Sequence, residues 1–249
     1  MNLRKENEEK ILRVAIVLDE SGSMGAVKKE TLSGLNEHIQ ELRKGKEKGI
    51  TTYVTLVTFS GADSIKERYV NVLVDDMPDL TKKDYDPNGM TAMFDGLARG
   101  LNLLKGAPDT EKTTYMVLVI TDGQENASKE FKGPQVKEMI TTLEANKKWT
   151  ITYMGANQDI FEVQDTLGIN PSNMALYSSS SIGTKHAFRK MSDCTSQYLC
   201  ARADTDNMSG FSFYNNNGTG PADFSNVTVG DPDPSLVAYT ISSSNSDVK

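Results

Sequence analysis

The 249-residue sequence predicts an α/β fold, with a mostly parallel sheet covered by helices on both faces. Two short runs, residues 13–18 (RVAIVL) and 115–120 (YMVLVI), are almost entirely apolar, which is typical of strands buried on both faces. Around them, strand-like and helix-like segments alternate along the chain, as they do in parallel sheets. We therefore expect the two apolar strands at the centre of the sheet.

The first apolar strand is followed by a predicted helix over residues 28–44, where apolar side chains recur at helical spacing with charges between them. These apolar residues are Leu32, Leu35, Ile39 and Leu42. Residues 50–60 are rich in Thr, Val, Tyr and Phe and predict a strand. A short turn (GADS) then leads to another predicted strand over residues 65–74.

The second half of the predicted domain continues the alternation. A helix is indicated by Met93, Leu97, Leu101 and Leu104, and Gly106 ends it. After the second apolar strand, the pattern predicts helix, strand, helix, strand and helix over residues 136–143, 149–154, 159–168, 174–177 and 187–199. The strand at 174–177 is expected at the edge of the sheet.

The composition divides the chain into three parts. Residues 1–10 form a charged leader with no apolar segment after it, so they do not resemble a secretion signal. Residues 11–200 form the α/β domain. Residues 201–249 are rich in Asn, Ser, Asp and Gly and are interpreted as an extension that either forms strands or is partly disordered. Within it, residues 227–229 and 236–241 are candidates for short strands.

The charge balance restricts the classes of partner. The formal net charge is −7, which argues against general binding to nucleic acid or to anionic membranes. No apolar stretch approaches the length of a membrane span. Only two cysteines and two histidines are present, which favours a reducing compartment and leaves little for triad chemistry. We expect a cytoplasmic protein; export of a processed chain and a place in a virion stay open.

Oxygen-bearing side chains follow both apolar strands. Asp19, Ser21 and Ser23 come directly after the first strand, and Asp122 comes directly after the second. Thr91 stands at the start of the helix that begins near Met93. Because the carboxyl ends of parallel strands meet at one edge of a sheet, these side chains are expected to lie close together. A set of oxygen ligands without His or Cys suits Mg²⁺, Mn²⁺ or Ca²⁺.

The order Asp-x-Ser-x-Ser, Gly-x-Thr and Thr-Asp-Gly over about residues 11–200 resembles the von Willebrand factor A (vWA) domain and its metal-ion-dependent adhesion site. The resemblance implies a Rossmann-like fold, with a doubly wound, mostly parallel six-stranded sheet. The resemblance implies that Ser21, Ser23 and Thr91 supply hydroxyl ligands, most often to Mg²⁺. It implies that Asp19 and Asp122 bind the cation directly or through water. The remaining position is typically filled by an acidic residue of a partner protein.

Three functions follow from these observations. The first is a divalent-metal-dependent protein–protein interaction module. The second is a structural subunit or adaptor of a larger assembly, because intracellular microbial relatives often serve AAA+ ATPases and some are encoded by phages. The third is a Mg²⁺-dependent phosphotransfer enzyme with Asp19 as the acceptor, but Ser21 stands where haloacid-dehalogenase-like phosphatases need a second Asp. We expect a binding protein with no catalytic residues.

The candidate ligands are further expected at a solvated loop edge. On this view, Asp19→Ala and Asp122→Ala weaken metal binding without unfolding the chain. Thr91→Val likewise leaves the stability nearly unchanged while it removes one ligand.

Overall fold

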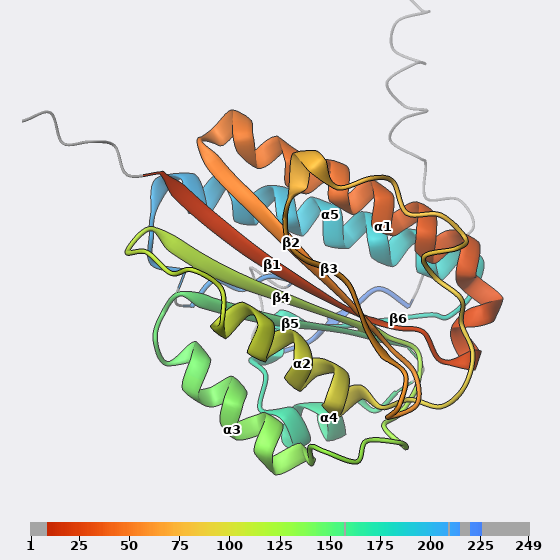
Figure 1. Ribbon diagram of the computed structural model, residues 1–249. Coiled ribbons are helices and arrows are strands. Elements are labelled where there is room, and N and C mark those ends of the chain that lie inside the picture. Colours follow the sequence, from red (N-terminus) through yellow and green to blue (C-terminus); the bar gives the residue numbers. More distant parts are fainter. Residues whose placement is uncertain (1–8, 157, 209, 215–219, 226–249) are drawn as a thin grey trace, which may run out of the picture.

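The computed structural model describes residues 9–156, 158–208, 210–214 and 220–225 (Figure 1). Its strands are β1 (Lys10–Asp19), β2 (Ile50–Phe59), β3 (Ile65–Leu73), β4 (Thr113–Thr121), β5 (Trp149–Ala156), β6 (Met174–Tyr177) and β7 (Ala222–Asp223). Its α-helices are α1 (Lys28–Arg43), α2 (Met93–Lys105), α3 (Gly133–Glu144), α4 (Ile160–Leu167) and α5 (Ser181–Asp204). The predicted α/β class is confirmed.

The strands form one sheet in the order β3-β2-β1-β4-β5-β6-β7. All neighbouring strands run parallel except β2 and β3, which pair antiparallel. The two apolar strands, β1 and β4, lie side by side at the centre, as their composition predicts. Strands buried on both faces cannot alternate apolar with polar residues, which is why their sequences read as continuous apolar runs.

The sheet separates two hydrophobic layers, and side chains of β1 alternate between them. Leu12, Val14, Ile16 and Leu18 pack on the face covered by α1 and α5. Ala15 and Val17 pack on the opposite face, beneath the residues of α2, α3 and α4 (Figure 1). Each fully buried aliphatic side chain contributes about 1.5–3 kcal/mol to folding, so both faces hold β1 in place. Its carboxyl end is thereby fixed as a platform for the loops that follow.

The sheet has one strand more than predicted, and the edge lies elsewhere. β7 comes from the extension and pairs with β6, through Ala175–Ala222 and Leu176–Asp223. The expected edge strand at residues 174–177 is therefore covered, and β7 takes the edge position within the described residues. The candidate strands at residues 227–229 and 236–241 lie outside the described residues, as do residues 1–8 of the leader.

The expected domain boundary at residue 200 falls inside α5, which runs on to Asp204. The reason is Arg202, a buried side chain that donates to Thr114 Oγ1 at 2.8 Å and to Asp206 Oδ1 at 2.6 Å. Phe213 and Tyr214 of the extension are also buried in the layer beneath α5. Within the described ranges, none of the helices combines the length and apolar character that a membrane crossing needs.

His38 in α1 makes the stability of this layer depend on pH. It is fully buried, and neither of its ring nitrogens has a hydrogen-bond partner among the described residues. Burial lowers the pKa of its imidazole from 6.5 to about 3. Below pH 6.5 the unfolded chain therefore binds a proton that the folded chain does not, so His38 increasingly destabilises the fold as the pH falls from 6.5 towards 3.

We expect His38→Leu to stabilise the fold relative to the parent by an amount that grows in acid. At about pH 5.5 the pH-dependent part of the gain is about 1.4 kcal/mol. Urea unfolding of both chains at about pH 7.5 and about pH 5.5 measures it, since the difference between them isolates His38 from the carboxyl groups. A difference that stays the same at both pH values would contradict this account.

Candidate metal centre

The candidate ligands lie where the order of the strands reverses. The chain passes from β1 to β2 on one side and from β4 to β5 on the other, so β1 and β4 border the switch point of the sheet. Ligands of such sheets bind outside the carboxyl ends of these two strands. Asp19 is the last residue of β1, and Asp122 directly follows β4. The fold therefore places both carboxylates at the same edge.

Asp19 is held by two hydrogen bonds. Its Oδ1 accepts from the Ser21 backbone N–H at 2.7 Å, and its Oδ2 accepts from Thr121 Oγ1 at 2.6 Å. The side chain is fully buried, and this burial raises the pKa of its carboxyl group to about 6 against the effect of both hydrogen bonds. The neighbouring Asp122 carboxylate raises it further. The site thus holds a buried negative charge that a cation would stabilise.

The two serines connect β1 to β4. Ser21 Oγ lies 3.1 Å from Ser23 Oγ, and Ser23 Oγ donates to Asp122 Oδ1 at 2.5 Å. Ser21 directly precedes a 3₁₀ helix, Gly22–Val27, which contains Ser23 and whose Met24 is buried in the core. The buried Met24 side chain fixes this short helix above the sheet. The Asp-x-Ser-x-Ser and Thr-Asp-Gly segments are therefore in direct contact.

Thr91 reaches the same point from a third loop. A β carbon built on Gly123 would lie 3.0 Å from Thr91 Oγ1 and 3.7 Å from Asp19 Oδ2, so both oxygens face the space beside Gly123. The loops are held together because Thr91 N–H donates to Asn126 Oδ1 at 2.9 Å and Asn126 N–H donates to the Thr91 carbonyl at 3.0 Å. All five predicted ligands are thus brought together.

The chemistry of the donors fits a hard divalent cation. Three hydroxyls and two carboxylates provide oxygen ligands, which Mg²⁺, Mn²⁺ and Ca²⁺ prefer, and they include no nitrogen or sulfur. Among the described residues, no group of three or more His, Cys, Asp or Glu side chains is arranged to hold a metal ion. A cation at this edge therefore depends on the hydroxyls of Ser21, Ser23 and Thr91 as much as on the carboxylates.

The expected solvated position is wrong for three of the five residues. Asp19, Ser21 and Thr91 are buried, Asp122 is half-buried, and only Ser23 is exposed. The cause is the long connection between β3 and α2, which folds back over the end of β1. Its Tyr85 hydroxyl donates to the Asp19 carbonyl at 2.7 Å. At Gly89, a positive φ of 82° presents the carbonyl that accepts from Gly22 N–H at 3.1 Å.

Glu20 is a structural part of the site that the sequence interpretation missed. Its fully buried carboxylate accepts from Arg68 at 2.8 Å and 3.1 Å and from the Asp86 backbone N–H at 2.7 Å, with Lys66 at 3.3 Å. It thereby fastens β3 and the covering connection to the turn after β1. The available signal was the pair Lys66 and Arg68, which share one face of a predicted strand by their period of two.

Thr121, the first residue of the Thr-Asp-Gly segment, also positions the site. Besides its bond to Asp19, its hydroxyl lies 3.1 Å from both the N–H and the carbonyl of Gly123. One side chain therefore orients the carboxylate and shapes the turn after β4.

Comparisons with known proteins identify the family of the fold. The family profile described as von Willebrand factor type A domain matches residues 14–191. Inter-alpha-trypsin inhibitor heavy chain H3 from Pongo abelii and from Homo sapiens is 32% identical over 135 and 138 residues, respectively. Each alignment covers 51% of this chain but only 15% and 14% of those proteins, so the chain spans about one seventh of their length.

Solved structures are similar in fold. The pilus adhesin SpaC from Lactobacillus rhamnosus GG in its open conformation has a TM-score of 0.59 at 12% identity, over 76% of this chain and 30% of that chain. The PilB minor pilin from Streptococcus sanguinis has a TM-score of 0.54 at 16% identity, over 78% of this chain and 63% of that chain. With the family profile covering most of the chain, and with the sheet order and the three loop segments described above, the chain belongs to the von Willebrand factor type A domain family.

Proposed function

We propose that this chain is a divalent-metal-dependent protein-binding module. Asp19, Ser21, Ser23, Thr91 and Asp122 would hold the cation, with Mg²⁺ the first candidate and Mn²⁺ and Ca²⁺ as alternatives. When bound, the cation supplies a positive centre that a carboxylate of a partner protein can occupy. The observation that carries this proposal is the convergence of three hydroxyls and two carboxylates from separate loops at the switch point of the sheet.

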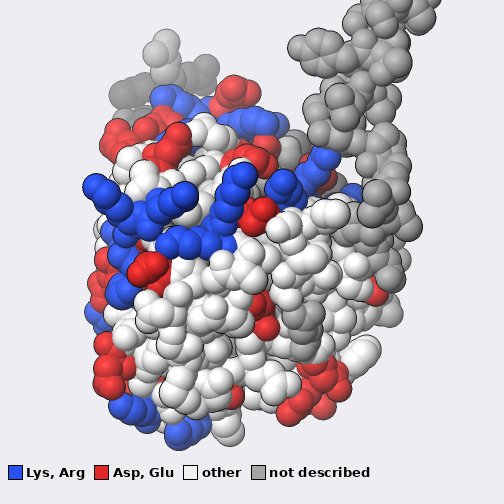
Figure 2. Space-filling model, turned by 90° about the vertical axis from the view of Figure 1, so that its right-hand side faces the viewer, with Lys and Arg blue, Asp and Glu red and all other residues white. Residues whose placement is uncertain are grey.

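The surface around the site suits an acidic partner. Figure 2 views the side of the molecule at which the central strands end. There, Lys and Arg side chains gather in one area, with Asp and Glu side chains among them and at its margins, beside a largely uncharged area. Positive potential near a binding site speeds the approach of a negatively charged partner. Ser23 is exposed, so this side of the site is open to a partner.

Binding without catalysis is part of the proposal. The hydroxyls of Ser21 and Ser23 contact each other and Asp122, so neither is paired with a histidine base. Of the two histidines, His38 is buried in α1, and His186 in α5 packs edge-on against Phe224 at 6.2 Å between ring centroids. These side chains support a role as a receptor for a carboxylate rather than a hydrolase.

The proposal is tested with the full chain. Thermal unfolding in EDTA is compared with unfolding in millimolar Mg²⁺, Mn²⁺ or Ca²⁺, and a rise in Tm reports binding to the folded state. The immobilised chain is then used to capture proteins in Mg²⁺ and in EDTA, with captured proteins identified by mass spectrometry. No rise in Tm with any of the three cations would refute the proposal, as would capture that EDTA does not reduce.

Thr91→Val tests the role of Thr91 as a metal ligand separately from its role in the stability of the fold. No hydrogen bond of the Thr91 hydroxyl is found within the described residues, so valine keeps the buried shape and leaves no partner unpaired. We expect the Tm in EDTA to change little. The affinity for Mg²⁺ is expected to fall by at least about tenfold, because a direct ligand is lost.

Two further variants control this measurement. Thr91→Ser retains the hydroxyl and is expected to retain most of the Mg²⁺ response. Thr142→Val makes the same substitution at an exposed position of α3 and is expected to leave the response unchanged. Calorimetric titration of the three chains with Mg²⁺ gives the comparison. Parent-like Mg²⁺ binding by Thr91→Val would show that the loop before α2 is not part of the site.

A further inference from the structure

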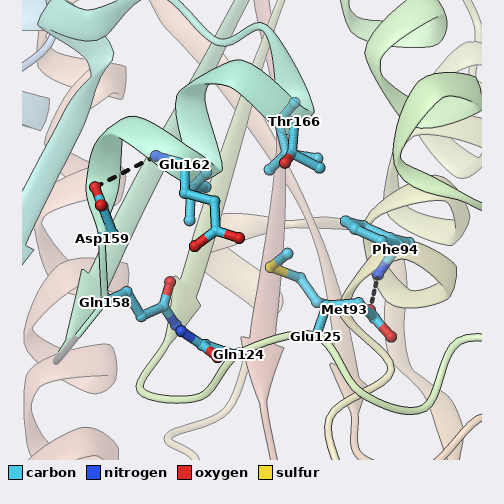
Figure 3. A pocket seen from close by; sticks show the side chains of 10 residues that line it. Met93, Phe94, Gln124, Glu125, Gln158, Asp159, Glu162 and Thr166 are labelled. Atoms are coloured by element: carbon cyan, nitrogen blue, oxygen red, sulfur yellow. Dashed lines mark hydrogen bonds between the residues drawn. The ribbon is translucent and has the colours of Figure 1, made fainter.

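A cavity of about 270 Å³ adjoins the candidate metal centre, between α2 and the start of α4 (Figure 3). Met93, Val163 and Leu167 give it an apolar lining, and Met93 and Leu167 are themselves buried. Glu125, Glu162 and Gln158 bring polar groups to it. Pockets for drug-sized molecules usually have volumes of about 300–1,000 Å³, so this cavity lies just below that range and has room for a side chain.

The cavity is built from the same loops as the candidate metal centre. Met93 stands two residues after Thr91, and Gln124 stands two residues after Asp122. Two residues span at most about 7 Å. Gln158 is fixed between the two places, because it donates to the Gly123 carbonyl and its Oε1 accepts from the Tyr153 hydroxyl. A peptide with a carboxylate at the metal centre therefore carries its neighbouring residues past this cavity.

The cavity has an excess of negative charge. Its lining includes Glu125, Asp159 and Glu162 but no Lys or Arg. The first two are engaged: Glu125 accepts from Phe94 N–H at 2.9 Å, and Asp159 caps α4 through Phe161 N–H at 3.0 Å. Glu162 differs, because its carboxylate has no hydrogen bond or ion pair within the described residues and points into the cavity (Figure 3).

We propose that this cavity takes a cationic side chain, arginine or lysine, of the same partner that gives its carboxylate to the metal. This inference rests on the proposed function. The apolar lining packs against the aliphatic stem, and Glu162 pairs with the charged head. A purely apolar side chain would pack on the same lining but would leave the exposed Glu162 carboxylate without a charged partner. The site therefore selects sequences in which an acidic residue has a basic residue nearby.

The cavity is tested first without metal. The full chain in EDTA is titrated with n-butylguanidinium, and the methyl signals of Met93, Val163 and Leu167 are followed by NMR. We expect saturable shifts at these methyls, about fivefold weaker affinity in Glu162→Gln, and parent-like affinity in Glu138→Gln on the exposed face of α3. The neutral analogue n-butylurea is expected to bind more weakly.

Two results of this titration would overturn the proposal that the cavity binds a cationic side chain. One is the absence of shifts at the three methyls. The other is equal affinity for the guanidinium and the urea in both the parent and Glu162→Gln, which would mark the cavity as a site for apolar groups only. Both results are independent of the metal, so they leave the proposed function untouched.

The shared partner is tested in Mg²⁺ with synthetic peptides. Each peptide contains one Asp and, one to three residues away, either Arg or its neutral isostere citrulline. We expect the Arg peptides to bind the parent about fivefold more tightly than the citrulline peptides, and Glu162→Gln to remove this difference. EDTA is expected to abolish binding of both peptides, and Thr91→Val to weaken binding of both. Metal-dependent binding with no preference for Arg would refute the cavity proposal and keep the proposed function.

The opposite combination of results would refute the proposed carboxylate-binding function instead. If n-butylguanidinium binds in the cavity while no peptide binds in Mg²⁺, the cavity binds a cationic group but the carboxylate-binding function fails, and with it the shared partner.

Discussion

Asp19→Asn is expected to abolish Mg²⁺ binding and, in EDTA, to raise the Tm above that of the parent. The two effects have one cause. The Asp19 carboxylate is fully buried, and both this burial and the nearby Asp122 carboxylate oppose its charge when no cation is bound. Asparagine keeps the size of the side chain and removes the charge, so the metal-free fold gains about 1–3 kcal/mol while the ligand is lost.

The hydrogen bonds around Asp19 allow this exchange. The amide oxygen can accept from Ser21 N–H, as Oδ1 does now. The amide NH₂ would face Thr121 Oγ1, which lies near enough to the Gly123 carbonyl, at 3.1 Å, to redirect its own proton there. Every buried polar group then keeps a partner.

Asp19→Ala provides the contrast. It removes the same charge but leaves Ser21 N–H without its acceptor and opens a small cavity, so the Tm in EDTA is expected to fall below that of Asp19→Asn by an amount equivalent to about 1–3 kcal/mol. Calorimetric unfolding of the three chains, with and without Mg²⁺, measures both effects. An asparagine variant that still responds to Mg²⁺, or that is less stable in EDTA than the alanine variant, would contradict this account.

The fold was largely predictable because its strongest signals are local. Strands buried on both faces must be apolar throughout, so the apolar runs of β1 and β4 predict both that these segments are strands and that they lie at the centre of the sheet. The helices show apolar residues at helical spacing because one side of each packs on the sheet. The candidate ligands follow from the same logic, since strand ends at a switch point converge whatever the rest of the chain does.

What the sequence did not predict depends on contacts between distant segments. The burial of Asp19 comes from the connection after β3, where Tyr85 contacts the end of β1. Because this connection is distant from Asp19 in the sequence, the residues around Asp19 do not predict its burial. The seventh strand and the buried Phe213 belong to a segment that is rich in Asn, Ser and Gly. The few apolar residues of this segment that pack on the domain do not stand out from this composition. Composition averaged over the extension therefore hid the part of it that packs on the domain.

Gly34→Ala is expected to destabilise the chain strongly, although alanine is the better helix former. Gly34 lies in α1, where this helix packs against α5. A β carbon there would lie 2.5 Å from Phe188 Cβ and 2.9 Å from Phe188 Cδ1. Because the nearer of these two atoms is bonded to the α5 backbone, the helices must move apart. Overpacking of this kind costs about 1–3 kcal/mol, more than the ~1 kcal/mol that helix propensity returns.

A double-mutant cycle separates this clash from other causes. Phe188→Ala alone leaves a cavity and is expected to cost about 3–5 kcal/mol, whereas in Gly34→Ala/Phe188→Ala the new methyl group occupies part of that space. The double variant should therefore lose less stability than the sum of the single variants. Gly25→Ala is the control, because a β carbon there meets no atom within 4 Å. Urea unfolding in EDTA measures all four variants, and strict additivity of the two single losses would show that Gly34 does not set the distance between α1 and α5.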